Sequence, residues 1–558
     1  MAYDQFSPTP REKFRTVPVL FTILVLFAMI LSACGGSANT PNNKGKAVLT
    51  VAAQSQDFSQ AAFNPYNAHP NSGVLGLVYE TLYFANVNDG SYTPWLATDY
   101  KWNSDNTQLT FTIRQGVKWN DDKPFDANDV VYTYKALQQY KAADIQGVWN
   151  YLKDVTNPDA NTVVMTLQKA YPPAFYYIAS QVYILPKHIY EPAGDPTKFT
   201  PDKPVGTGPF VLSKFSNELA TYDKNPGFWK ADQVKVDQIK FPAYKGNDAF
   251  KLALPKGDID WAGFFQSDLD TAFVQKDPQH NHYWMAPVNM YALFVNQKDP
   301  QLSQLPVRQA INAAIDRDKI AKQAVSGLAD PANVTGLILP NQKAYLDSTY
   351  SSLSNTANVA QAQKFLTDAG YTKGSDGVFV DKSGKKLAFK MRLVQGYTDW
   401  EQAAQIMQQT LKEVGIQVTL DPFTEDAYYP ARTDGKWQLM IGGMVGGPNP
   451  YYMYNSYLNS KQIGSTNFGQ FSDPAVDQAL EKFASTTDET VQKQAIQTIE
   501  KIYVEKLPIL PLYNGPAWFE YRTTRFTGWP DKDNPYAVGS PFTAPDIEQV
   551  VLHLQPVQ

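Results

Sequence analysis

The sequence predicts an α/β protein with parallel β-α-β units, and three consecutive patterns favour this class. Residues 387–393 alternate apolar and polar side chains, as a half-buried strand does. Residues 403–414 then place apolar side chains at helical spacing, and Gly415 ends the helix before a second alternating segment at 416–420. Strand, helix and strand in this succession are typical of parallel β-α-β units, in which ligands bind beyond the carboxyl ends of the strands.

Shorter elements follow from the same kinds of pattern. Alternation predicts strands at 47–53, 109–113 and 162–167. The sequences TDWE at 398–401 and TTDE at 486–489 have the capping-box form. In each of them we expect the first threonine to be the N-cap residue and the glutamate to reach back to it.

Length and composition limit the class of protein. At about 100–200 residues per domain, 558 residues predict two to four domains. Charged residues make up 18% of the chain and the net charge is −5, so we expect no nucleic-acid partner. Aromatic residues make up 13%, which together with the low charge favours neutral polar ligands over phosphates. Cys34 is the single cysteine, so no intrachain disulfide is possible.

The first 33 residues have the features of a lipoprotein signal peptide. A basic segment at 11–15 precedes an apolar run at 17–31, which is shorter than the roughly 20 residues of a membrane span. Residues 31–34, LSAC, resemble a bacterial lipobox, so we expect cleavage before Cys34 and a lipid on its sulfur. We expect residues 34–46 to provide the lipid anchor and a flexible tether. The mature protein is expected outside the cytoplasm, anchored to the cell membrane by its N-terminal lipid.

No catalytic or metal-binding pattern occurs in the sequence. The five histidines form no HExxH motif, and the GxSxG, GxxxxGK(S/T) and GxGxxG patterns are absent. His280 and His282 are close together, but in a loop-like segment where we expect them to be exposed rather than metal-bound. These observations favour a binding protein without a cofactor over an enzyme.

Residues 110–134, TFTIRQGVKWNDDKPFDANDVVYTY, carry a family resemblance. They resemble the signature of the extracytoplasmic solute-binding proteins of family 5, the dipeptide, oligopeptide and nickel class that serves ABC importers. The positions that match are Arg114, Gly116, Val117, Lys118, Asp121, Pro124, Phe125, Ala127, Asp129 and Val130. Further matching blocks keep family order at 204–210, 225–229, 307–310 and 314–317. Within the blocks, Gly116, Gly206 and Gly208 are expected in turns that need positive φ.

The resemblance implies a two-lobed periplasmic-binding-protein fold of type II, like that of the peptide-binding proteins, with an extra N-terminal subdomain. It also implies a monomer that closes on a ligand and delivers it to permease subunits in the membrane. We expect the chain to cross the hinge near Asn289 and Asn514. The expected parts are lobe I at 47–82, 204–288 and 515–558, the subdomain at 83–203, and lobe II at 289–514.

Departures from the family pattern bear on the ligand. In peptide-binding relatives, an aspartate in the segment that matches 443–454 holds the peptide ammonium. This sequence has no aspartate there, and Asn449 supplies no charge. Residues 396–400, GYTDW, are similar to the GWTDW segment of a branch that binds cello-oligosaccharides, as are 514–520 and 528–537. The resemblance is closest to this branch and implies a cellobiose-like or cello-oligosaccharide ligand.

Candidate ligand-binding residues follow from the chemistry of sugars, whose apolar C–H faces lie on aromatic rings and whose hydroxyls need neutral donors and acceptors. The candidate rings are Tyr397, Trp400, Tyr451, Tyr452, Trp518 and, from lobe I, Trp261. The candidate amides are Asn449, Asn455 and Asn514. Because Tyr451 and Tyr452 are adjacent, we expect them to face different ways, with one of them structural.

Three other interpretations stay open. An oligopeptide ligand would need a carboxylate elsewhere in the cleft, such as Glu80 or Asp399, for its ammonium. An anchored glycoside hydrolase would need a pair of carboxylates that cannot be identified from sequence alone. A receptor that passes signals to a membrane kinase would use the same fold.

Overall fold

The structure is a computed structural model that describes residues 45–52, 61–67, 69–244 and 247–557. Cys34 and the predicted signal peptide lie outside the described residues. The chain from Lys46 onward forms one compact unit. No helix in the described part of the chain has both the length and the apolar character needed to cross a bilayer.

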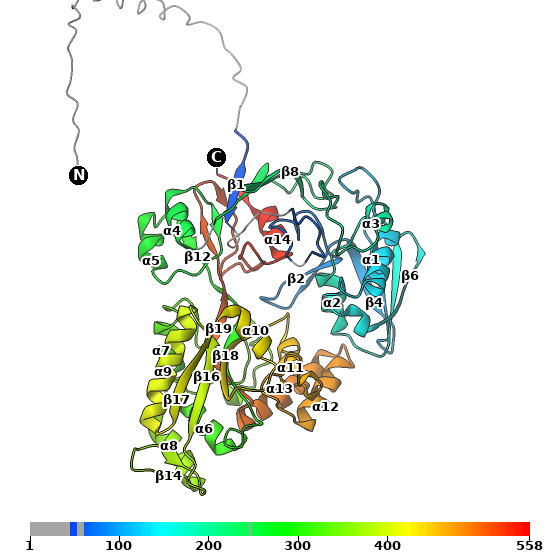
Figure 1. Ribbon diagram of the computed structural model, residues 1–558. Coiled ribbons are helices and arrows are strands. Elements are labelled where there is room, and N and C mark those ends of the chain that lie inside the picture. The colour runs from blue at the N-terminus through cyan, green and yellow to red at the C-terminus, as the bar shows by residue number, and fades with distance from the viewer. Residues whose placement is uncertain (1–44, 53–60, 68, 245–246, 558) are drawn as a thin grey trace, which may run out of the picture. The chain divides into compact units, whose positions relative to one another are not determined.

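Lobe I is built on a seven-stranded sheet with the strand order β12-β20-β11-β1-β10-β9-β8 (Figure 1). Strand β1 is parallel to β10 and β11, and the other pairs are antiparallel. The strands are β1 (Val48–Ala52), β8 (Phe210–Ser216), β9 (Leu219–Lys224), β10 (Gln238–Pro242), β11 (Trp261–Ala262), β12 (Asn281–Tyr283) and β20 (Glu520–Arg522). The helices are α4 (Asn247–Lys256), α5 (Leu269–Ala272) and α14 (Asp546–His553), and β21 (Phe526–Thr527) pairs with β22 (Gln555–Pro556).

The extra subdomain contains an antiparallel sheet with the order β4-β5-β7-β6. Strands β5 and β7 confirm the predictions made from alternation at 109–113 and 162–167. The strands are β4 (Ala97–Trp102), β5 (Gln108–Ile113), β6 (Leu152–Asp159) and β7 (Thr162–Leu167), preceded by the hairpin of β2 (Tyr83–Ala85) and β3 (Tyr92–Pro94). The helices are α1 (Ala127–Gln139), α2 (Ala174–Gln181) and α3 (Lys187–Ala193).

Lobe II is built on a five-stranded sheet with the order β17-β16-β18-β13-β19. Strand β16 is parallel to β17 and β18, and α9 packs on β16 and β17 (Figure 1), so the predicted β-α-β unit is confirmed. The strands are β13 (Ala286–Val295), β16 (Ala388–Val394), β17 (Gln417–Phe423), β18 (Leu439–Val445) and β19 (Ile509–Ala517), with the small pair β14 (Thr372–Lys373) and β15 (Phe379–Val380). The helices are α6 (Leu305–Ala314), α7 (Arg317–Gln323), α8 (Val359–Asp368), α9 (Thr398–Val414), α10 (Glu425–Ala431), α11 (Pro450–Leu458), α12 (Pro474–Ala484) and α13 (Glu489–Lys506).

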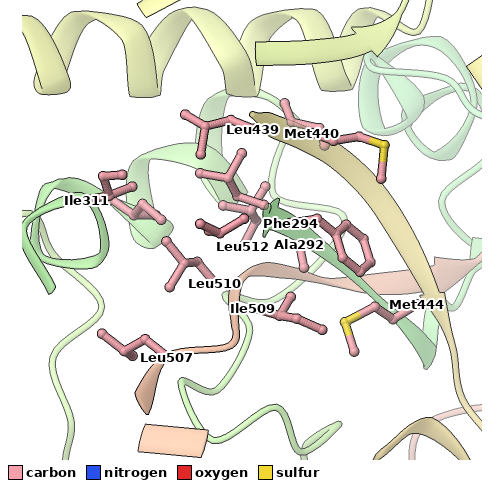
Figure 2. Packing of buried hydrophobic residues seen from close by; sticks show 14 of the residues in the cluster. Ala292, Phe294, Ile311, Leu439, Met440, Met444, Leu507, Ile509, Leu510 and Leu512 are labelled. Atoms are coloured by element: carbon pink, nitrogen blue, oxygen red, sulfur yellow. The ribbon is translucent and has the colours of Figure 1, made fainter. Parts of the chain in front are cut away.

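The core of lobe II lies between this sheet and the helices that pack on it. Phe294 from β13, Leu439 from β18 and Leu510 from β19 are fully buried and gather with Ile311 of α6 (Figure 2). Fully burying such a side chain stabilises the fold by about 1.5–3 kcal/mol. The loops that follow β16 and β18, at 395–397 and 446–449, therefore extend from a well-packed sheet.

The chain passes between the two large sheets twice, once from β12 to β13 and once from β19 to β20. Strands β13 and β19 pair antiparallel along their length, starting from Ala286 opposite Ala517. Sheet membership puts the crossings at 284–285 and 518–519, whereas the sequence placed them near Asn289 and Asn514, which lie inside the paired strands. Two adjacent connections of this kind are the geometry of a hinge.

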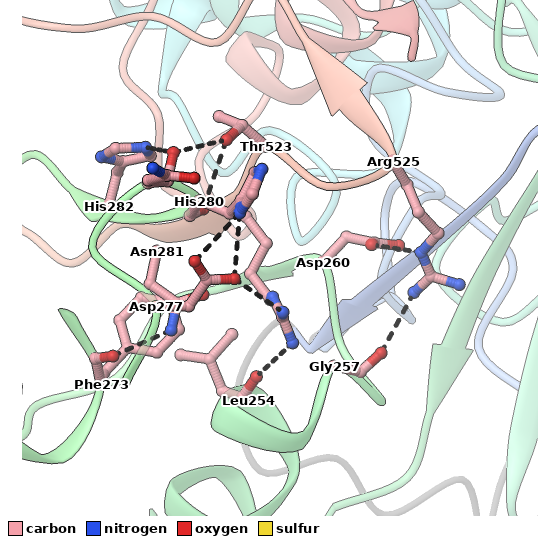
Figure 3. A network of polar contacts seen from close by, with 12 residues as sticks. Leu254, Gly257, Asp260, Phe273, Asp277, His280, Asn281, His282, Thr523 and Arg525 are labelled. Atoms are coloured by element: carbon pink, nitrogen blue, oxygen red, sulfur yellow. Dashed lines mark hydrogen bonds and ion pairs between the residues drawn. The ribbon is translucent and has the colours of Figure 1, made fainter. Parts of the chain in front are cut away.

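Polar contacts hold the C-terminal strands of lobe I to the preceding segments (Figure 3). Arg525 donates from Nε to the buried Asp260 over 2.6 Å, and His280 contacts Asp277 over 3.0 Å. His282 is half-buried and does not share this carboxylate. Among the described residues, no group of three His, Cys, Asp or Glu side chains is placed to hold a metal ion.

Candidate ligand-binding site

The candidate site begins at the carboxyl ends of two neighbouring parallel strands of lobe II. Strand β16 ends at Val394 and leads through 395–397 into α9. Strand β18 ends at Val445 and leads through 446–449 into α11. Because β16 and β18 are parallel neighbours, both loops leave the same edge of the sheet. This edge is the ligand-binding position that the topology predicts.

Aromatic rings gather around the first of these loops. Trp400 lies 5.2 Å from Tyr397, 5.7 Å from Tyr291 of β13 and 5.7 Å from Tyr428 of α10, measured between ring centroids. Trp400 itself is only 4% exposed, whereas Tyr397 is half-buried and Tyr429 is 40% exposed. The structure thus brings Tyr397 and Trp400 together, with Tyr397 presenting surface and the buried Trp400 packed against it.

A carboxylate lies beside these rings. Asp399, in the first turn of α9, accepts a 2.8 Å hydrogen bond at Oδ2 from the hydroxyl of Tyr513 in β19. Burial raises the pKa of Asp399 above its ordinary value, and the hydroxyl of Tyr513 opposes that rise. The residue as a whole is half-buried.

The second loop is tied to the hinge and carries Asn449. The N–H of Gly446 donates to Oδ1 of Asn289 in β13 over 3.1 Å. Asn449 is the N-cap of α11, and its Oδ1 accepts a 3.0 Å hydrogen bond from the N–H of Tyr451. Val445, just before the loop, is 69% exposed. The loop therefore places one neutral amide and one apolar side chain at this edge, without a carboxylate.

Both tyrosines that follow are buried where lobe II meets the subdomain. Tyr451 is 2% exposed and Tyr452 is 4% exposed. The hydroxyl of Tyr451 donates to that of Tyr171 over 2.9 Å, and the hydroxyl of Tyr452 donates to the carbonyl of Pro173 over 3.0 Å. Asn455 lies one turn further along α11 and accepts from Nδ2 of Asn459 over 2.8 Å.

Trp261 lies in the core of lobe I instead of facing the cleft. It has no exposed surface, its ring packs on Phe519 and Trp529, and its indole N–H donates to the carbonyl of Gly539 over 2.7 Å. The side chain of Trp261 therefore makes all of its contacts within lobe I. Glu80, considered for a peptide ammonium, is likewise fully buried.

Asn514 and Trp518 lie on the segment that leaves lobe II. Asn514 is 2% exposed, and its Nδ2 donates to the carbonyl of Leu339 over 3.0 Å, while its Oδ1 has no partner among the described residues. Trp518 is half-buried at the crossing, with its ring 5.1 Å from Phe265. Phe542, near Gly263, is 40% exposed. Lobe I thus has an aromatic surface of its own beside the hinge.

Tyr291, Phe265 and Tyr429 belong to the candidate site, although the sequence analysis did not identify them. Phe265 follows the short strand β11, so the rule that ligands bind after strand ends would have indicated it. Tyr291 lies within a strand, where no local pattern distinguishes it from core residues. Only the three-dimensional packing of β13 against α9 places it here.

The geometry agrees with comparisons to known proteins. A family model described as "Bacterial extracellular solute-binding proteins, family 5 Middle" matches residues 91–465. The oligopeptide-binding protein OppA of Bacillus subtilis is 24% identical over 524 residues, covering 88% of this chain and 93% of the relative. The nickel-binding periplasmic protein of Escherichia coli is 25% identical over 458 residues, covering 78% and 83%.

Solved structures give the same result. The periplasmic oligopeptide-binding protein of an oligopeptide ABC transporter from Thermotoga maritima superposes with a TM-score of 0.84 at 24% identity, covering 92% of this chain and 99% of that one. Its mannohexaose-bound form superposes with a TM-score of 0.76 at 25% identity, with the same coverage. Because the family model covers more than half of the chain, this protein belongs to the bacterial extracellular solute-binding proteins of family 5, the substrate-binding proteins of ABC importers.

Proposed function

We propose that the protein captures an oligosaccharide of the cellobiose or cello-oligosaccharide kind between its lobes and delivers it to an ABC permease. Contacts that form only when both lobes touch the ligand shift the hinge equilibrium toward the closed form. In this proposal the protein acts as a monomer held at the membrane by a lipid on Cys34. It needs no cofactor and performs no chemistry.

The aromatic cluster around Trp400 carries the proposal. A sugar ring is neutral and has apolar C–H faces, so it binds to aromatic surfaces that are supported from behind. Tyr397 and Tyr429 offer such surface, and the buried ring of Trp400 keeps the cluster in place. On lobe I, Trp518 and Phe265 offer a second aromatic surface.

The absence of a charged side chain from the second loop, at 446–449, also favours a neutral ligand. A buried ammonium without a counter-charge is costly. Asn449 supplies only an amide at the position where peptide-binding relatives are expected to have an aspartate. A mannohexaose-bound neighbour with the same fold adds support that this architecture accommodates sugars.

An oligopeptide is the second candidate, and a specific observation favours it. Asp399 is a half-buried carboxylate beside the aromatic cluster, where it would pair with a peptide ammonium. Several relatives are named as oligopeptide-binding proteins, including those of Bacillus subtilis and Haemophilus influenzae.

Parallel titrations of tryptophan fluorescence test the two candidates. The purified protein is titrated with cello-oligosaccharides and with tri- to pentapeptides, and the sugars are analysed for cleavage after prolonged incubation. A saturable change with intact sugars alone supports the proposal. A response to peptides alone overturns it in favour of the second candidate, and sugar cleavage would indicate a glycoside hydrolase instead. A neighbouring kinase gene without permease genes would argue for signalling rather than transport.

A further inference from the structure

A cavity of about 550 Å³ lies where the subdomain meets lobe II. This volume is within the range of roughly 300–1,000 Å³ that is typical of small-molecule sites. We propose that this seam cavity is a second compartment of the binding site, which holds the terminal rings of a long oligosaccharide whose other end occupies the aromatic cluster at Trp400. The inference rests on the proposed function and extends it to the length of the ligand.

The subdomain supplies an aromatic wall. Tyr100 and Trp102 alternate along the edge strand β4, so they point to the same face of the sheet. Their partners on β5, Phe111 and Leu109, are fully buried, which identifies this face as the one that covers the subdomain core. Yet Tyr100 is 38% exposed and Trp102 is half-buried. At Tyr100 and Trp102, this face of the sheet is therefore not covered by the core and borders the cavity.

This aromatic wall is supported from behind. Phe175 of α2 lies 4.3 Å from Tyr100 and 4.9 Å from Tyr92, between ring centroids. One side of the Tyr100 ring is thus fixed by packing while its surface borders the cavity. A ring held in this way loses little freedom when the C–H face of a sugar covers it.

Lobe II supplies polar groups of mixed charge. The Oδ1 of Asn449 caps α11, whereas its Nδ2 has no acceptor among the described residues. Thr487, Glu489 and Lys493, at and near the start of α13, also border the cavity. A hydroxyl and side chains of both signs suit a neutral ligand with many hydroxyls better than an anion or a cation.

Two contacts fix the opposite walls to each other. The hydroxyl of Tyr452 reaches the carbonyl of Pro173, and Gly90 packs against the carbonyl of Pro448 so closely that a Cβ there would come within 2.6 Å of the oxygen. All four residues line the cavity. Both contacts join the subdomain to lobe II, so they hold the walls of the compartment together in this arrangement of the lobes.

The loop that carries Asn449 connects this compartment with the hinge. Gly446 bonds to Asn289, and Asn449 borders the cavity three residues later. Three residues span at most about 10 Å. A ligand of several sugar rings therefore reaches from the hinge edge past Asn449 into the seam cavity. A disaccharide bound at the aromatic cluster does not reach this cavity.

The test compares affinities for cello-oligosaccharides of two to six rings by calorimetry, in the wild type and in Trp102→Ala and Tyr100→Ala. Tyr132→Ala, which removes a half-buried ring of α1 that does not border the cavity, is the matched control. We expect both cavity variants to weaken the binding of the longer sugars by roughly three- to tenfold while the shortest sugar that binds is unaffected. The control should follow the wild type at every length.

A filling variant makes the test independent of losses in folding. Thr487→Trp places a bulky ring at an exposed position on the lobe II side of the cavity. It should exclude the longer sugars selectively. Equal effects at all lengths, or no effect in any cavity variant, would overturn this inference and leave the proposed function standing. If no sugar of any length binds the wild type, the proposed function itself fails, and this extension fails with it.

Discussion

The hydroxyl of Tyr513 lies 2.8 Å from Oδ2 of Asp399 and joins hinge strand β19 to the first turn of α9. Tyr513 is fully buried, and its ring stacks on Tyr291 at 4.9 Å. The strand that leaves lobe II for lobe I is thereby coupled to the loop that presents Tyr397. A ligand that touches Asp399 or Tyr397 acts directly on an element connected to the hinge.

We expect Tyr513→Phe to destabilise the protein by about 1–2 kcal/mol, because Asp399 then loses a donor in a half-buried position. The pKa of Asp399, already raised by burial, should rise further. The loss should therefore be greater at pH 7, where the carboxylate is charged, than at pH 4. Urea unfolding at both pH values measures it. Tyr291→Phe, whose hydroxyl makes no hydrogen bond among the described residues, is the control, and equal losses in both variants would contradict the assignment.

The regular part of lobe II was predictable because each local signal there agrees with the tertiary fold. Strand β16, helix α9 and strand β17 lie close to the predicted ranges, and Gly415 adopts a φ of 105° at the end of the helix. The helix starts were less predictable. The first capping-box prediction was wrong, because α9 begins at Thr398 and its N-cap is Tyr397. Glu401 accepts instead from the N–H of Gly396 over 2.8 Å.

The second capping-box prediction was wrong for a physical reason. Helix α13 begins at Glu489, and its N-cap is Asp488, whose side chain accepts from the N–H groups of Thr490 and Val491. Aspartate caps a helix at least as well as threonine. A short sequence that contains both residues therefore cannot specify which of them starts the helix.

Some glycines and aromatic residues have environments that the sequence patterns did not predict. Gly116 has the expected positive φ of 79°, whereas Gly206 and Gly208 do not. At these two positions a Cβ would collide with the backbone of the segment at 77–78, so close approach is what excludes a side chain. Trp261, which we expected to face the cleft, is the first residue of β11 and is fully buried. No local pattern distinguishes a tryptophan that enters the core from one that faces a ligand.

Tyr397→Ala should weaken the binding of the proposed oligosaccharide by roughly three- to tenfold, because the half-buried ring offers the accessible aromatic surface of the cluster. Tyr350→Ala removes a half-buried ring elsewhere in lobe II and should leave the affinity unchanged. Calorimetric titration with the sugar that the wild type binds best measures the effect. Unchanged affinity in Tyr397→Ala would show that the sugar does not bind at this cluster.

Asn449→Asp tests whether the missing charge excludes peptides. The substitution keeps the N-cap acceptor for Tyr451, and a carboxylate is favoured at the N-terminus of α11, so the fold should be retained. We expect the variant to acquire measurable binding of peptides with a free N-terminus, and N-acetylated peptides to show none. If the wild type already binds the same peptides equally well, Asn449 does not determine the ligand class.

The stability of lobe I should depend on pH through Asp546, at the start of α14. Its Oδ1 accepts a 2.7 Å hydrogen bond from the N–H of Val538, and burial raises the pKa of Asp546 to about 7. Because the folded state binds this proton more tightly than the unfolded chain, the stabilisation is complete below about pH 4 and is lost as the pH rises toward 7. Asp546→Asn should therefore gain stability over the wild type with increasing pH, by as much as about 4 kcal/mol.

Denaturant unfolding between pH 4 and pH 8 measures this dependence. Asp202→Asn, which changes an exposed aspartate, should parallel the wild type across the whole range. A constant difference between Asp546→Asn and the wild type at all pH values would show that the buried carboxyl does not change its proton affinity on folding.

Gly90→Ala and Gly116→Ala form a matched pair that tests the contact between the subdomain and lobe II. Both glycines have positive φ, 76° and 79°, so alanine strains the backbone by about 1 kcal/mol at either position. Only at Gly90 would the added Cβ meet a neighbour, the carbonyl oxygen of Pro448 at 2.6 Å, whereas nothing lies within 4 Å at Gly116.

We therefore expect Gly90→Ala to cost on the order of 1–3 kcal/mol more than Gly116→Ala in urea unfolding, because the hairpin and the loop at Pro448 must separate. Hydrogen exchange should also increase in α2 and α11, because the hydroxyl of Tyr452 in α11 bonds to the carbonyl of Pro173, the N-cap of α2, at this seam. Gly116→Ala should leave exchange in both helices unchanged. Equal unfolding losses, with protected α2 and α11 in both variants, would mean that the subdomain and lobe II move independently of this contact.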